Sequence, residues 1–128
     1  MAANPYKLVQ NETATPMDLW DRGFRRCVAL LQGAKSAMAK GDPESQISKA
    51  KSLHDAFAIV EFWDAALPPD NTVGEPPTLS PRLRKSYAFI MHRIVTANGS
   101  NHATDIDEAV VMLKHLHDVF HQKIQAVA

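Results

Sequence analysis

Residues 15–43 read TPMDLWDRGFRRCVALLQGAKSAMAKGDP, and this stretch contains a complete helix with its start and its end. A capping threonine followed at once by proline opens the helix. The threonine accepts hydrogen bonds from free N–H groups, and proline is tolerated only in the first turn. Gly41 ends the helix after a basic last turn, and a second capping pair, Asp42-Pro43, follows directly. Two helices joined by so short a turn are typical of an antiparallel bundle.

The pairing of a capping residue with proline occurs four times and divides the chain into helices. The pairs are Asn4-Pro5, Thr15-Pro16, Asp42-Pro43 and Ser80-Pro81. Apolar residues spaced by three or four predict helices over residues 16–40, 43–67 and 81–98, and from Thr104 to the C-terminal end. The predicted fold class is all-α: an antiparallel four-helix bundle with a short mobile N-terminal segment or helix. Asn4-Pro5 is expected to be the hinge of that segment.

The length of 128 residues predicts a single helical-bundle domain over residues 1–128. Residues 1–14 precede the first long helix as an N-terminal tail. Residues 68–81 hold five of the eight prolines, so they are expected to form a loop between the second and third helices.

Composition excludes several classes of function. Fourteen basic and fourteen acidic residues give a net charge of zero, which argues against binding to nucleic acid or to an anionic membrane. The short basic clusters at 25–26 and 82–85 are interpreted as solvated helix faces. No segment approaches the roughly 18 apolar residues of a membrane span, and the start of the chain has no secretory signal. The expected location is the cytoplasm.

Residues 56–67 read AFAIVEFWDAAL, in which Glu61 and Asp64 are the only charges. A helix that is apolar on nearly every side must be buried on nearly every side. Either another element of the chain covers Phe62 and Trp63 or a partner does. Burial within the chain is the favoured alternative, and the second marks this segment as a candidate binding surface.

The sequence contains no recognised catalytic or metal-binding motif, so no cofactor and no enzyme activity are expected. His117 and His121 share a helix face, but no Glu-x-x-His motif of a di-metal bundle occurs, and we interpret these histidines as solvent-exposed. His54 lacks the Lys-Gly that follows the histidine of phosphotransfer bundles. The single cysteine, Cys27, falls on an apolar helical stripe and is predicted to be a buried, inert thiol.

Several short motifs follow one another in an order typical of one known family. They are Asn4-Pro5-Tyr6 in the tail, Thr15-Pro16-Met17-Asp18-Leu19 at a helix start, the Gly41-Asp42 turn, Lys49-Ala50 with Leu53 and Asp55, Tyr87, Phe89, Ile90, Arg93 and Ala97-Asn98 in the third helix, and Asp107-Glu108-Ala109-Val110, Met112-Leu113, Leu116 and Phe120 in the last. On these residues the chain resembles a divergent member of the FliS family of flagellar secretion chaperones.

One departure from the family pattern lies in the first long helix. Members of the family read Leu-Tyr-Asp-Gly-Ala where this chain has residues 23–27, GFRRC. Arg26 places a long side chain where the family has glycine, which conflicts with any close helix approach at that position. The proline-rich loop is also atypical.

The resemblance implies a cytoplasmic export chaperone that binds the C-terminal segment of flagellin, prevents its premature polymerisation and aids flagellar type III secretion. A component of the flagellar export gate is a second implied partner. Tyr6 is implied to be a mobile lid over the client groove. The residues expected to contact the partner are Tyr6, Leu19, Phe24, Ile59, Phe62, Trp63, Tyr87 and Met91.

Two alternatives stay open. The chain could be a non-catalytic regulatory or structural bundle that has lost or changed its client. A metal-dependent bundle enzyme using His117 and His121 is the other.

Overall fold

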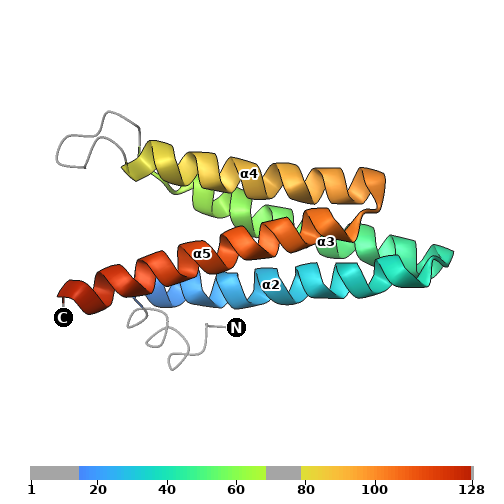
Figure 1. The fold of residues 1–128 in the computed structure, drawn as a ribbon, viewed down its shortest axis with the longest axis horizontal. Coiled ribbons are helices and arrows are strands. Elements are labelled where there is room, and N and C mark those ends of the chain that lie inside the picture. Colours follow the sequence, from blue (N-terminus) through green and yellow to red (C-terminus); the bar gives the residue numbers. More distant parts are fainter. Residues whose placement is uncertain (1–14, 69–78, 128) are drawn as a thin grey trace, which may run out of the picture.

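The computed structural model describes residues 15–68 and 79–127, and these form four helices without a strand (Figure 1). The helices are α2 (Pro16–Lys40), α3 (Pro43–Ala65), α4 (Leu79–Ser100) and α5 (Ala103–Val127). Each helix packs against the next one along the chain, and α5 packs back on α2. The predicted antiparallel four-helix bundle is therefore confirmed. The N-terminal segment with Asn4-Pro5 and Tyr6 lies outside the described residues.

The first two helices begin where the capping residues predict. The hydroxyl of Thr15 accepts a hydrogen bond from the backbone N–H of Asp18 at 3.0 Å, and the Thr15 N–H donates to the Asp18 carboxylate at 3.2 Å. Asp42 accepts from the backbone N–H of Ser45 at 3.0 Å and from its hydroxyl at 2.6 Å. Between the two helices, Gly41 has a φ of 74°, a left-handed conformation that glycine adopts at little cost.

The fourth cap-proline pair, Ser80-Pro81, lies inside the first turn of its helix rather than at the helix start, so the prediction for this pair was wrong. Helix α4 begins at Leu79, so Ser80 lies within its first turn and is buried. Pro81 is compatible with this position because the first four N–H groups of a helix have no partner inside it. Residues 69–78 of the expected loop lie outside the described part of the chain.

Three further helix boundaries differ from the expected ones by one or two residues. Helix α3 ends at Ala65 rather than at residue 67, and α5 begins at Ala103 rather than at Thr104. Helix α4 continues past Gly99 and ends where Asn101 takes a φ of 59°. Asparagine is one of the few residues other than glycine that tolerates this left-handed conformation.

The core is built from the apolar stripes of all four helices. Its largest fully buried side chains are Leu31, Leu53, Ile90, Ile94, Ile106, Leu113, Val60 and Cys27. Each buried leucine or isoleucine contributes about 1.5–3 kcal/mol relative to an exposed one.

Two cations close the C-terminal ends of helices. The Lys49 ammonium is buried and donates to the carbonyl of Asn98 at 3.2 Å and to the side-chain oxygen of Asn101 at 3.0 Å. Arg84 donates to the carbonyl of Pro68 at 2.9 Å, just beyond the end of α3. Positive charge is favourable there because a helix C-terminus leaves carbonyl groups without partners. Arg84 is thus partly buried and capping, which corrects its interpretation as part of a solvated cluster.

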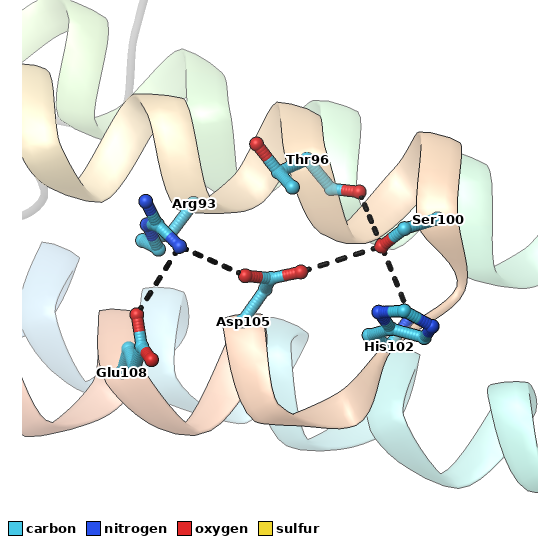
Figure 2. A network of polar contacts seen from close by, with 6 residues as sticks. All are labelled: Arg93, Thr96, Ser100, His102, Asp105 and Glu108. Atoms are coloured by element: carbon cyan, nitrogen blue, oxygen red, sulfur yellow. Dashed lines mark hydrogen bonds and ion pairs between the residues drawn. The ribbon is translucent and has the colours of Figure 1, made fainter.

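A second polar cluster holds α4 against the start of α5 (Figure 2). Arg93 lies 3.0 Å from the buried carboxylate of Asp105 and 3.3 Å from that of Glu108. The Ser100 hydroxyl lies 3.3 Å from the other Asp105 oxygen and 2.8 Å from the Thr96 carbonyl. Arg93, one of the residues of the family pattern, therefore joins the two helices near their turn.

A tight contact between α2 and α3 occurs at Gly23 of α2. A Cβ atom added there would lie 2.9 Å from Cζ2 of Trp63 on α3, closer than real Cβ contacts allow. The indole therefore occupies the space that a side chain at residue 23 would fill. Arg26 is exposed and does not prevent helix contact, so the conflict expected at that position does not arise.

Two glycines of α2 provide a matched test of this contact. Alanine in place of glycine inside a helix adds up to about 1 kcal/mol of stability. Gly33 has open space around it, so Gly33→Ala should raise the free energy of unfolding by that amount. Gly23→Ala should cancel the gain or lower stability, since overpacking costs about 1–3 kcal/mol. Urea denaturation of both variants checks this, and an equal gain in both would contradict the contact.

The Cys27 thiol provides a test of the core. Cys27 is fully buried, and burial raises the pKa of its thiol to about 12. The native protein should resist alkylation by iodoacetamide at pH 8 and react rapidly in urea, as followed by mass spectrometry. Above pH 9 the unfolded chain loses this proton while the folded chain keeps it, so the free energy of unfolding should fall towards pH 12. Cys27→Ala should make this fall shallower; an unchanged slope would contradict the burial of the thiol.

Candidate functional site

An apolar groove of about 710 Å³ opens at the end of the bundle where α2 begins and α3 ends. This volume is in the range of ligand-binding pockets. The lining residues come from the first two turns of α2, from the last part of α3 with the residues that follow it, and from α4. They are Pro16, Leu19, Trp20, Gly23, Ala58, Ile59, Phe62, Trp63, Ala66, Leu67 and Tyr87.

Helical spacing brings these residues to the groove. The lining residues of α2 follow the spacing i, i+3, i+4, i+7, so they share one face of the helix. They are Pro16, Leu19, Trp20 and Gly23. The lining residues of α3 follow the same rule across the segment 58–66. Because that segment is apolar around most of its circumference, it can face the core and the groove at once.

Three aromatic side chains form the floor of the groove. Trp63 is buried, with only 8% of its surface exposed. The Trp20 ring stacks on the Trp63 ring with centroids 4.8 Å apart. The ring of Tyr87, on α4, lies 5.8 Å from the Trp63 ring. The indole N–H of Trp20 donates to the Tyr87 hydroxyl at 3.2 Å. Burial raises the pKa of Tyr87, which keeps this hydroxyl protonated.

Two large apolar side chains of the groove lining are exposed to solvent. Phe62 is 72% exposed and Leu19 is 53% exposed, on opposite helices of the groove. Each of the two alternatives for residues 56–67 therefore applies to one residue. The chain itself buries Trp63, whereas nothing in the described part of the chain covers Phe62.

The groove contains five of the eight residues expected to bind a partner. These five are Leu19, Ile59, Phe62, Trp63 and Tyr87. Phe24 does not line the groove; its ring stacks on those of Trp20 and His117, with centroids 5.6 Å and 4.4 Å away. Met91 is partly buried against the core and does not line the groove, and Tyr6 lies outside the described residues.

Two residues that shape the groove, Trp20 and Gly23, were not among the residues predicted from the sequence. Trp20 lies four positions before Phe24 on the same stripe, so its spacing could have found it. Gly23 gave no such signal, because its role depends on Trp63, which reaches it from another helix.

The described lining carries no charged side chain. Its Trp20 N–H and Tyr87 hydroxyl bond to each other, which leaves the aromatic floor little polar capacity for a ligand. Such a surface is suited to holding apolar side chains by burial rather than to acid–base chemistry.

The family model of flagellar protein FliS matches residues 1–127 of the chain. The chain belongs to the FliS family. No curated protein matches it. Members of this family are flagellar export chaperones, and the groove described above is the candidate partner-binding site of this chain. Among the described helices, none combines the length and the apolar character that a membrane span needs.

A separate cluster, outside the groove, brings together three side chains of the types that can bind a metal ion. Asp21 of α2 lies beside His117 and His121 of α5, and one ligand atom from each residue lies within 4.8 Å of the others. Both histidines are partly buried, and His117 stacks on Phe24. Their interpretation as solvent-exposed side chains was therefore wrong.

The hydrogen bond in the groove floor predicts a cost for losing the tyrosine hydroxyl. Tyr87→Phe would leave the partly buried Trp20 N–H without its partner and should lower the free energy of unfolding by about 1 kcal/mol. Urea denaturation followed by circular dichroism measures the change. Unchanged stability of Tyr87→Phe would show that the bond contributes nothing.

Proposed function

We propose that this chain binds the C-terminal segment of flagellin in the groove between α2 and α3, and holds it in the cytoplasm until export. The observation that supports this most is the pair of exposed apolar side chains, Phe62 and Leu19, on either side of a buried aromatic floor. Exposed apolar patches of this kind mark surfaces that bind partners. Tyr6 is proposed to cover part of the groove when no client is bound.

Burial of apolar surface would drive the interaction. An amphipathic client segment would place its apolar side chains against Phe62, Leu19 and the ring of Trp63. Each leucine or phenylalanine that becomes fully buried contributes about 1.5–3 kcal/mol. Much of this gain is offset because an unfolded segment loses conformational freedom when it is ordered on a surface. Several such side chains are therefore needed, which a long open groove can accommodate.

The chaperone action would follow from occupancy of the client's apolar face. A flagellin segment held in the groove cannot pair with another flagellin through the same face, so premature polymerisation is suppressed. Binding requires no chemical step, in keeping with a described lining that has no charged group.

Phe62 and a distant residue of α3 form a matched pair for testing the groove. Phe62 is 72% exposed and Ile47 is 71% exposed, so aspartate at either position should leave the fold intact. Only Phe62 lines the groove. Phe62→Asp should weaken binding of a flagellin C-terminal peptide at least about tenfold, the loss expected from about 1.4 kcal/mol of burial. Ile47→Asp should bind as the unchanged protein does.

Titration calorimetry measures both affinities, and intrinsic fluorescence adds a local readout. Trp20 and Trp63 are the only tryptophans of the chain, and both line the groove. Client binding at the proposed place should therefore shift their emission. Equal weakening by the two variants, or binding without a change in emission, would place the client elsewhere. No binding of any flagellin segment would favour a bundle that has lost or changed its client.

A further inference from the structure

We propose that Asp21, His117 and His121 form a binding site for a divalent transition metal ion, with Zn²⁺ as the ion that suits it best. Two imidazoles and a carboxylate are a ligand set that zinc commonly takes, with a fourth position left for water. The site is distinct from the groove and does not depend on the proposed function.

Two of the three distances between ligand atoms are close to those around a tetrahedral ion, and all three lie within 4.8 Å. Oδ1 of Asp21 lies 3.0 Å from Nε2 of His121 and 3.7 Å from Nε2 of His117. With bonds of about 2.0–2.2 Å, ligand atoms around tetrahedral zinc lie roughly 3.3 Å apart. The Asp21 oxygen is therefore already close to both imidazoles at about the spacing that a shared ion requires.

Local structure holds the ligands in place. The two histidines are four positions apart on α5, so they project from the same face, as paired zinc ligands on a helix do. The His117 ring is fixed by stacking on Phe24 at 4.4 Å, and the His121 ring lies 4.2 Å from that of His117. Nε2 of His121 lies within hydrogen-bonding distance of the Asp21 carboxylate, at 3.0 Å, and a bound ion would replace this contact.

A second carboxylate faces the far nitrogen of one ligand. Nδ1 of His117 lies 3.9 Å from Oδ1 of Asp118. Zinc-bound histidines usually donate their other N–H to a carboxylate, which orients the ring and raises its basicity as a ligand. A small rotation of the exposed Asp118 side chain would complete this arrangement.

The site would fasten the last turns of α5 to the start of α2, which lie side by side in Figure 1. Asp21 directly follows Trp20, and the His117 ring lies 6.3 Å from the Trp20 ring. An ion bound here would therefore hold the aromatic side chain that forms part of the groove floor.

Metal binding is tested on the full chain without a polyhistidine tag. Equilibrium dialysis against Zn²⁺ should give one ion per chain, and Co²⁺ bound at the site should quench tryptophan fluorescence because Trp20 lies close by. His121→Gln should lower the affinity for Zn²⁺ at least about tenfold, since even outer-shell changes cost that much. Asp21→Asn, which preserves a hydrogen-bonding side chain, should do the same.

His54→Gln is the matched control, because His54 is an exposed histidine on α3 that belongs to no group of metal ligands among the described residues. It should bind Zn²⁺ as the unchanged chain does, and circular dichroism should show that all variants are folded. The proposal is overturned if the folded protein retains no Zn²⁺. It is equally overturned if His121→Gln and Asp21→Asn bind the ion as tightly as His54→Gln.

Discussion

The contact of the Trp63 indole with Gly23 is the constraint on which the rest of the site depends. A side chain at residue 23 would push α2 and α3 apart or displace the indole. With the indole in place, Trp20 stacks against it and reaches the Tyr87 hydroxyl, which brings α4 to the same point. One missing side chain thus allows three helices to meet at an aromatic floor.

The bundle places its polar groups where helix geometry requires them and keeps them out of the groove. Lys49 and Arg84 close helix ends, and Arg93 joins α4 to α5 through Asp105. Each of these charges has a specific partner, so a chain with zero net charge still orders its helices electrostatically. None of these charged side chains lines the groove, where Phe62 remains exposed.

Much of the fold could be predicted from local sequence signals. The contacts between residues far apart in the chain could not be predicted from them. Thr15 and Asp42 cap their helices as expected because a cap involves only residues three positions apart. Ser80 misled because proline is accepted at several positions of a first turn. The cluster of Asp21 with His121 joins residues 100 positions apart, and no spacing within one helix announces it. The groove was found in part, because its apolar residues stand out, whereas Gly23 has no side chain to mark it.

The groove is built almost entirely by the first helical hairpin. All of its lining residues except Tyr87 lie between residues 16 and 67, so its walls are synthesised before α4 and α5. Domains fold as the chain leaves the ribosome, N-terminal parts first, and apolar surface exposed at that stage promotes aggregation. The burial of Trp63 is therefore complete only after Tyr87 has been synthesised and has packed against it. During translation, the nascent chain therefore exposes its own apolar groove lining, which can promote aggregation until α4 and α5 have been synthesised.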